Sequence, residues 1–320
     1  MSTNKIAELP GIQFFPYDLE YNCGDFAFRL DDAFEKTVES IDRLGCVSEG
    51  WLNLPTTNYD RFGPAPLHRS RLIDHTARIG SAHSLSLRPS HRIVASYGIS
   101  PKLLRGLALV FGFATGMYLL PGGYSFLHKI PANRSTLGDL LINDRDVVEV
   151  LSEFKRYLDR ASSTEADLLV GSIATLLRTE CRSFSYERFL GAYIALEGCA
   201  KLAAMSQGKI KLAASHAELP AALCDYASIP VPIGAQASIL VAAGSKRKTC
   251  KYALLRNEMI HEALHDSEPL GFQHSLEMLD ASIEICGIVR RSIFKILGLD
   301  SDQISSPVDT KMSFLFELRS

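Results

Sequence analysis

The 320-residue sequence predicts an α+β first half with short strands and irregular loops, followed by an all-α helical bundle. Aromatic residues alternate with other residues in "GIQFFPYDLEY" and "DFAFRL", a pattern typical of short strands. From about residue 136 onward, apolar residues recur at three- and four-residue steps, as in helices that bury one face. Hydrophobic residues make up 47% of the chain and charged residues 22%, so a substantial core can form.

The first half offers one clear helix and several weaker signals. Residues 31–45 have helical spacing and end at a glycine, a common residue just past a helix C-terminus. Residues 50–70 are rich in Pro, Gly, Asn and Thr, which predicts an extended loop. The sequence of residues 83–100 is compatible with strands. The apolar run 101–120 fits either a buried helix or two buried strands, because its periodicity does not separate the two.

The second half consists of predicted helices. We expect helices over residues 144–161, 163–184, 185–206, 246–266 and 271–299. Asn143 or Asp144 would cap the first, and Ser163, Thr164 and Glu165 occupy N-cap positions of the second. The change in pattern divides the chain into three parts. These are an N-terminal α+β region without an assigned role (1–135), a helical bundle (136–302) and a tail (303–320).

Composition and targeting signals narrow the class of protein. A formal net charge of −2 excludes a globally basic nucleic-acid coat but leaves room for a local basic site. The 7 cysteines include no Cys-x-x-Cys pair, which favours free thiols in a reducing cytoplasm over disulfides or a cysteine zinc site. The N-terminus lacks a secretory signal pattern. The apolar stretch 106–120 is too short to span a bilayer and 226–245 is interrupted by prolines, so we expect a cytoplasmic protein without membrane insertion.

The segment "YALLRNEMIHEALHD", residues 252–266, carries two overlapping signatures. One is His-Glu-x-x-His, from His261 to His265. On one helix the two imidazoles can bind a zinc ion, with Glu262 as the base that activates water. Glu284 would be the third ligand, at a spacing that resembles the gluzincin metallopeptidases. The charged flanks differ from the apolar surroundings of such zinc helices, so a zinc hydrolase is the weaker interpretation.

The other signature is Arg-Asn-x-x-x-His, formed by Arg256, Asn257 and His261. Asn257 and His261 are four residues apart and share one helix face, which the long side chain of Arg256 can also reach. A guanidinium can hold phosphate oxygens, an imidazole can transfer a proton and an amide can orient either group. RNA supplies its own nucleophile, the 2′-hydroxyl. The trio therefore suits metal-free cleavage of RNA, although a purely structural role for these residues is also open.

The second half resembles the HEPN superfamily of small helical bundles over roughly residues 140–300. The resemblance rests on "RFLGAYIALEGCAKL" and the later "YALLRNEMIHEA". Bacterial HEPN proteins often pair a Phe-Leu-x-x-Tyr-Ile-Ala-Leu-Glu helix with a later Tyr-x-x-Leu-Arg-Asn-x-x-x-His helix. One departure is Glu262, where the family often has a glycine after the histidine.

The resemblance implies a dimeric, metal-independent endoribonuclease that needs no cofactor and leaves a 2′,3′-cyclic phosphate. By position, His261 is the acid/base, Arg256 stabilises charge on the phosphate, and Asn257 orients both. Tyr252 and Glu197 are supporting residues. The motif helices of two HEPN protomers face each other, so a homodimer through the bundle is expected.

Family members differ in what they do with this bundle. Many HEPN proteins act in phage defence, in toxin–antitoxin pairs or in stress responses, so an antitoxin or a regulatory partner is compatible with this chain. Others have lost catalysis and only bind or dimerise. A catalytically silent module is therefore the main alternative to the ribonuclease.

Four basic residues lie just before the motif. They are Lys246, Arg247, Lys248 and Lys251. In an RNA-binding protein they can track the phosphate backbone. They can equally form the solvated start of the helix predicted over 246–266, and the sequence does not decide between these interpretations.

Overall fold

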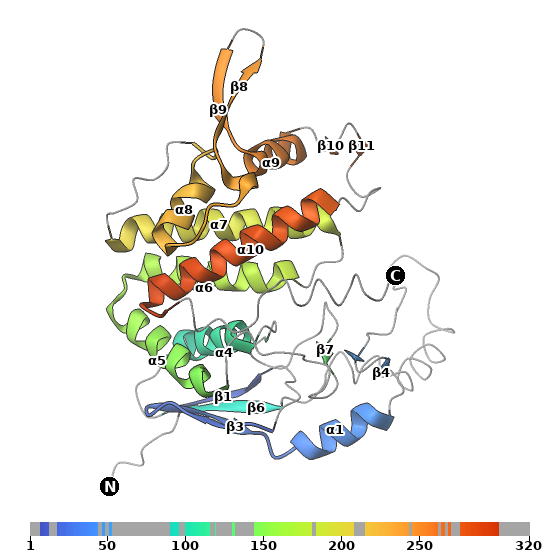
Figure 1. Cartoon of the computed structure of the whole chain (residues 1–320). Helices are drawn as coiled ribbons and strands as arrows, with labels where there is room; N and C mark the ends of the chain where they lie inside the picture. The colour runs from blue at the N-terminus through green and yellow to red at the C-terminus, as the bar shows by residue number, and fades with distance from the viewer. Residues whose placement is uncertain are drawn as a thin grey trace, which may run out of the picture. The chain divides into compact units, whose positions relative to one another are not determined.

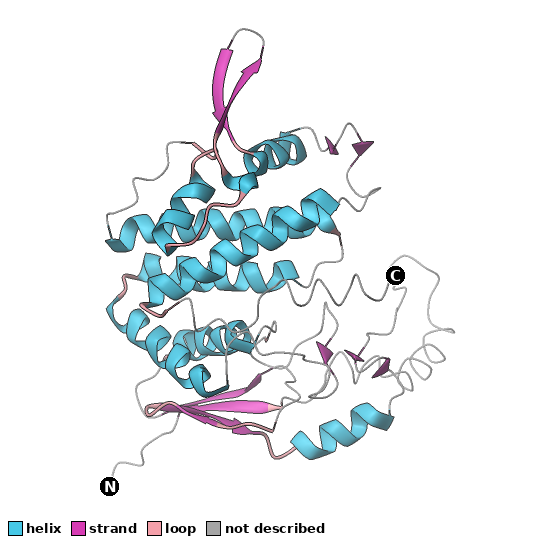
Figure 2. Cartoon of the chain, in the orientation of Figure 1, coloured by secondary structure: helices cyan, strands magenta, loops and turns pink. Residues whose placement is uncertain are grey.

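The computed structural model describes residues 7–12, 18–43, 47–48, 51–52, 90–95, 100–115, 119, 130–131, 144–180, 184–207, 215–242, 245–261, 264–265, 268–269 and 276–300. The chain forms two compact units, one of residues 1–140 and 147–152 and the other of residues 141–146 and 153–320. The first unit is α+β and the second is mostly helical (Figures 1 and 2). The predicted boundary at 135/136 lies shortly before this division, and the predicted tail 303–320 falls outside the described residues.

An antiparallel sheet forms the described core of the first unit. Its strand order is β1-β6-β3-β2, with β1 at Ala7–Ile12, β6 at His91–Ala95, β3 at Phe26–Leu30 and β2 at Tyr21–Asn22. The strand predicted from "DFAFRL" is confirmed as β3. Helix α4 (Pro101–Thr115) packs near β1, so the apolar run is a helix and the two-strand alternative is wrong. The rings of Phe28 and Phe111 stack with their centroids 4.5 Å apart and join the sheet to this helix.

The remaining described elements of the first unit are small. Helix α1 (Phe34–Arg43) confirms the helix predicted over 31–45. Three two-residue strands form a second antiparallel sheet in the order β4-β5-β7, at Val47–Ser48, Trp51–Leu52 and Ile130–Pro131. Most of the predicted loop 50–70 lies outside the described residues.

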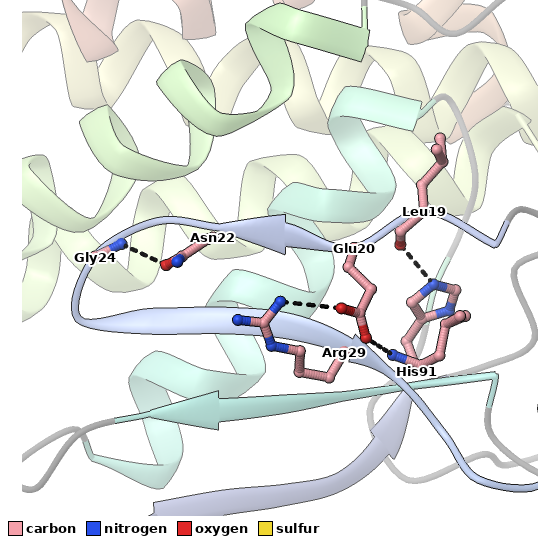
Figure 3. A network of polar contacts seen from close by, with 7 residues as sticks. Leu19, Glu20, Asn22, Gly24, Arg29 and His91 are labelled. Carbon is pink, nitrogen blue, oxygen red and sulfur yellow. Dashed lines mark hydrogen bonds and ion pairs between the residues drawn. The ribbon is translucent and has the colours of Figure 1, made fainter.

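A buried histidine lies at the start of β6, an inner strand of the first unit's sheet (Figure 3). His91 is fully buried; its Nε2 lies 3.0 Å from the Leu19 carbonyl oxygen and its Nδ1 lies 2.8 Å from Ser90 Oγ. A carbonyl can only accept, so Nε2 carries the proton and Nδ1 accepts from the serine hydroxyl. Burial lowers the pKa of His91 to about 4. The residue is thus a neutral structural histidine.

Beside it, Glu20 accepts the Leu30 backbone N–H at 3.0 Å and forms an ion pair with Arg29 at 3.0 Å. These bonds join the segment before β2 to strand β3 (Figure 3). The backbone N–H bond, together with the Arg29 charge, keeps the pKa of the Glu20 carboxyl below its usual value. The network links the segment before the edge strand β2 to its neighbour β3.

Helix α7 (Ser185–Gln207) is the centre of the second unit. It packs against α6 (Ser163–Glu180), α8 (Leu219–Ala227), α9 (Lys251–His261) and α10 (Leu276–Leu297), as Figure 1 shows. Within the helix predicted over 185–206, apolar residues recur at three- and four-residue steps, and the structure buries them: Phe189, Tyr193, Leu196 and Ala200. A helix surrounded on several sides needs apolar or small residues over most of its circumference.

The predicted helix positions of the second half are mostly confirmed. Helix α5 spans Asp144–Arg160, and α6 begins at Ser163. The α6 cap is one residue earlier than expected: Ser162 Oγ accepts from the Glu165 N–H at 3.3 Å, while Glu165 Oε2 accepts from the Ser162 N–H at 2.9 Å. This reciprocal capping satisfies two backbone donors. No helix among the described residues is long and apolar enough to cross a membrane.

The helix predicted over 246–266 is wrong at both ends. Residues Ser245–Thr249 form strand β9, which pairs with β8 (Ser238–Ala242) in a hairpin that extends away from the helices in Figure 1. Helix α9 occupies only Lys251–His261. After it, β10 (Leu264–His265) pairs with β11 (Glu268–Pro269). The 3-10 turn η2 (Ile233–Ala235) precedes the hairpin and packs near α9.

Two glycines of α7 allow close packing against α6. A Cβ on Gly191 would lie 2.2 Å from Thr179 Oγ1, and one on Gly198 would lie 2.4 Å from Ser172 Oγ. The glycines are about two helical turns apart on one face, opposite a matching pair of hydroxyl residues. The helices can therefore approach more closely than larger side chains would allow.

Replacing Gly191 with alanine is expected to reduce the free energy of unfolding by about 2 kcal/mol. Thr179 is buried and β-branched, and its Oγ1 donates to the Thr175 carbonyl at 2.7 Å, so a rotamer change would break this hydrogen bond. Urea unfolding followed by circular dichroism at the helical band measures the change. Gly171→Ala is the matched control, because a Cβ there meets nothing within 4 Å and should stabilise α6 slightly. Thr179→Ala should recover most of the loss in the double variant, and a simple sum of the two single effects would contradict this packing.

Candidate active site

Helix α9 presents the Arg-Asn-x-x-x-His signature. It follows directly on β9, and the Cys250 carbonyl accepts from the Leu254 N–H at 3.0 Å in its first turn. One face is buried in the bundle through Tyr252, Leu255 and Met259. The opposite face carries Asn257, which is half-buried, and His261, which is exposed. Burial of the first face thus decides which signature residues reach the surface.

Tyr252 fixes the position of α9. Its ring is fully buried, and its hydroxyl donates a hydrogen bond to Glu284 Oε2 on α10. Burial, together with this carboxylate, raises the pKa of the Tyr252 hydroxyl. A Cβ on Gly234 of η2 would lie 2.4 Å from the ring, so the turn rests directly on it. Tyr252 therefore supports the helix from behind and does not face the exposed side with His261.

Arg256 is half-buried and is not neutralised by a carboxylate among the described residues. Its Nη1 donates to Asn257 Oδ1 at 3.2 Å, and its Nε is buried without a hydrogen-bond acceptor. A buried guanidinium donor without an acceptor costs free energy unless a ligand or water supplies one. Arg256 and Asn257 are thus brought together as predicted, with the charge of Arg256 available to an anion.

The Arg256 guanidinium lies close enough to Tyr193 to influence its ionisation. Burial raises the pKa of Tyr193, the nearby Cys250 and Glu197 act in the same direction, and the Arg256 charge opposes them. Tyr193 and Glu197 both belong to α7. The predicted supporting residue Glu197 is therefore on the helix that packs against the signature helix, although it forms no ion pair with Arg256.

Glu197 instead pairs with His216, a residue that the sequence did not single out. Glu197 Oε1 and His216 Nδ1 are 3.2 Å apart, close enough for an ion pair but without the angles of a hydrogen bond. The Tyr193 hydroxyl donates to the His216 carbonyl oxygen at 3.3 Å, and the two rings lie 6.0 Å apart. No sequence pattern links these residues, because His216 lies in the connection before α8 and meets α7 only in the folded chain.

His261 is the last residue of α9 and is exposed. It forms no hydrogen bond or ion pair with the residues that the structure describes. Its imidazole is thus open to solvent and to a ligand. The structure brings Arg256 and Asn257 into contact and leaves His261 further along the same helix.

The arrangement differs from the one that the zinc interpretation requires. Because α9 ends at His261 and His265 belongs to β10, the two histidines do not occupy successive turns of one helix. Glu284, the expected third ligand, accepts the hydrogen bond of Tyr252. Within the described part of the chain, no group of three His, Cys, Asp or Glu side chains is placed to hold a metal ion. The assumption of the zinc interpretation, that His261 and His265 lie on one helix, is therefore wrong.

The predicted basic cluster is divided between two elements. Lys246, Arg247 and Lys248 lie on β9, opposite Val241, Leu240 and Ile239 of β8, and Lys251 is the first residue of α9. Lys248 pairs with Glu218, and Lys251 pairs with Glu277 at 2.9 Å. The interpretation of these basic residues as the solvated start of a helix is thus wrong for residues 246–248, because they belong to strand β9.

Comparison with protein-family models, curated proteins and solved structures found no match to this chain. Functional inference therefore depends on the residues and contacts described above.

Proposed function

We propose that this chain is a metal-independent endoribonuclease of HEPN type, with α9 as its catalytic helix. The observation that carries the proposal is the half-buried Arg256, whose only hydrogen-bond partner among the described residues is the neighbouring Asn257. A guanidinium without a carboxylate partner is suited to a phosphate, which it can bind through two parallel hydrogen bonds. The exposed imidazole of His261 on the same helix supplies the proton transfer that RNA cleavage needs.

The reaction follows from these two groups. The 2′-hydroxyl of the RNA gives up its proton to water as its oxygen attacks the adjacent phosphorus, and the bond from phosphorus to the 5′-oxygen of the next nucleotide breaks. Arg256 stabilises the negative charge that develops on the phosphoryl oxygens, and Asn257 holds the guanidinium through its 3.2 Å contact. His261 donates the proton that the leaving 5′-oxygen requires. The products are a 2′,3′-cyclic phosphate and a 5′-hydroxyl end.

The surroundings of α9 offer contacts to a longer RNA and to a second copy of the chain. The basic strand β9 leads directly into the helix, so a backbone bound at Arg256 can continue along the hairpin. Large apolar side chains are exposed on α9, with Ile260 at 50% and Leu254 at 43%, and on α7, which packs against it, with Ile194 at 59%. Burial of these side chains favours a homodimer through the bundle. The same surface would serve a catalytically silent module that only binds or dimerises.

The proposal is tested by incubating the purified full-length protein with 5′-labelled RNA in excess chelator. Cleavage is expected to proceed at the same rate with and without the chelator, because neither the nucleophile nor the acid requires a metal ion. The fragments should end in a 2′,3′-cyclic phosphate, detected by mass. An absence of cleavage would favour the silent binding module, and a loss of cleavage on chelation would indicate a metal-dependent hydrolase.

A further inference from the structure

We infer that the start of helix α7 binds one nucleotide of a single-stranded RNA through Phe184, Tyr186 and Arg188. Phe184 immediately precedes the helix, and Tyr186 and Arg188 lie in its first turn. In this site the base stacks on an aromatic ring and its phosphate binds the guanidinium. The inference deepens the proposed function and rests on it for the choice of RNA as the ligand.

Arg188 shares the feature that distinguishes Arg256. It is half-buried, and its Nε is buried without a hydrogen-bond acceptor. It forms no ion pair with a carboxylate of the residues that the structure describes. A buried guanidinium donor without an acceptor costs free energy unless a ligand or water supplies one. Arg188 is therefore suited to bind an anion.

The half-buried arginines of the first unit's sheet are different. Arg29 pairs with Glu20 at 3.0 Å, and Arg92 pairs with Asp32 at 3.5 Å. Partial burial of an arginine in this protein thus does not by itself mark a site for an external anion. Arg188 is set apart because no described carboxylate neutralises it.

An aromatic surface lies one helical turn before this guanidinium. The Arg188 N–H donates to the Phe184 carbonyl oxygen at 3.1 Å, so the two residues are neighbours on one face of the first turn. Phe184 is 41% exposed, which is unusual for a large apolar side chain. The half-buried Tyr186 stacks with it, with the ring centroids 5.7 Å apart and the rings inclined by 29°. Tyr186 therefore supports the Phe184 ring, part of which remains in water.

A nucleotide satisfies both groups at once. Its base covers the exposed area of Phe184, and its phosphate oxygens accept from the Arg188 guanidinium. An acidic protein segment would supply an acceptor to Arg188 but would leave the aromatic area exposed. The combination of the two groups, one turn apart, therefore favours a nucleotide over a carboxylate.

The ring also selects the form of the RNA. Bases in a duplex are stacked on one another, so their faces cannot lie against a protein side chain. Unpaired bases in single strands and loops can stack on aromatic side chains. The start of α7 thus gives the protein a preference for single-stranded RNA.

The test uses a short single-stranded RNA with methylated 2′-hydroxyl groups and one 2-aminopurine between uridines. Methylation removes the nucleophile, so the RNA is bound but not cleaved. Stacking on an aromatic ring quenches the fluorescence of 2-aminopurine, and fluorescence anisotropy of an end label gives Kd. Binding to the full-length wild-type protein is expected to quench the base.

Two variants separate the aromatic contact from the phosphate contact. Phe184→Leu keeps an apolar side chain but has no ring, so it should abolish the quenching and weaken binding about 5–150-fold. Arg188→Gln removes the charge, so it should weaken binding and reduce the slope of log Kd against log salt by about 0.7. Arg178→Gln removes an exposed arginine of α6 and should change neither quantity. A duplex of the same sequence should bind equally to wild type and Phe184→Leu.

The outcomes distinguish this site from the ribonuclease. Wild-type binding by both Phe184→Leu and Arg188→Gln would overturn the site, and cleavage of unmethylated RNA would leave the ribonuclease intact. Binding that depends on both residues without any cleavage of unmethylated RNA would support the site and overturn the ribonuclease. If polyglutamate reversed the quenching as effectively as an unlabelled RNA strand, the ligand would be a carboxylate and the nucleotide site would be lost.

Discussion

Arg256→Ala is expected to slow RNA cleavage about 10³-fold while leaving the helical content of the protein unchanged. The guanidinium is the only group of α9 that combines partial burial with an unneutralised charge, so no neighbouring side chain can take over its contact with phosphate. Its loss affects the transition state more than the bound substrate, because charge accumulates on the phosphoryl oxygens during attack. Single-turnover cleavage at saturating RNA measures the change in kcat.

Two further variants make this result specific. Arg256→Lys keeps the charge but loses the two-pronged geometry, so its rate should fall between those of wild type and Arg256→Ala. Arg178→Ala removes an exposed arginine from α6 of the same bundle and should cleave RNA at the wild-type rate. If Arg256→Ala and Arg178→Ala were equally active, Arg256 would be a structural arginine and the nuclease proposal would be lost.

The regular elements could be predicted where local pattern and tertiary environment agree. The alternating aromatics Phe26 and Phe28 are both buried in strand β3, and the apolar stripe of Ser185–Gln207 is buried in the centre of the bundle. The helical pattern predicted the wrong structure at Ser245–Thr249, which form a strand. A basic strand has little tendency of its own to extend, and it forms here because Ser238–Ala242 pairs with it. That partner is a separate strand earlier in the chain, so its contribution is not visible in helical periodicity.

The candidate site could be predicted as far as it lies on one helix. The spacing of Arg256, Asn257 and His261 predicts all three on one helix, and the structure has them on α9, with Arg256 and Asn257 in contact and His261 at its end. His216 was missed because its link to Glu197 depends on packing between α7 and the connection before α8. The zinc alternative failed for the opposite reason. It assumed that the helix continues past His261, whereas the chain enters a short hairpin at Leu264.

The first unit is expected to lose about 3 kcal/mol of stability as the pH falls from about 6.5 to about 4. Burial lowers the pKa of His91 to about 4 from its ordinary value of 6.5, against the smaller opposing effects of the Leu19 carbonyl, Glu20 and Asp31. Between these two values the unfolded chain binds a proton that the folded chain does not. The stability that His91 contributes is therefore complete above pH 6.5. It is lost as the pH falls, and it decreases no further below the folded-state pKa of about 4.

The single tryptophan, Trp51, belongs to the first unit, so its fluorescence during urea unfolding reports the stability of that unit. His91→Gln is the matched variant, because an amide N–H can still donate to the Leu19 carbonyl but does not titrate. The carboxyl groups of Glu20 and Asp31 are present in both proteins, and their own titration therefore cancels in the difference. The stability of wild type minus that of His91→Gln should rise by about 3 kcal/mol from pH 4 to 6.5. A difference that does not change with pH would mean that the buried imidazole accepts its proton as readily as in the unfolded chain.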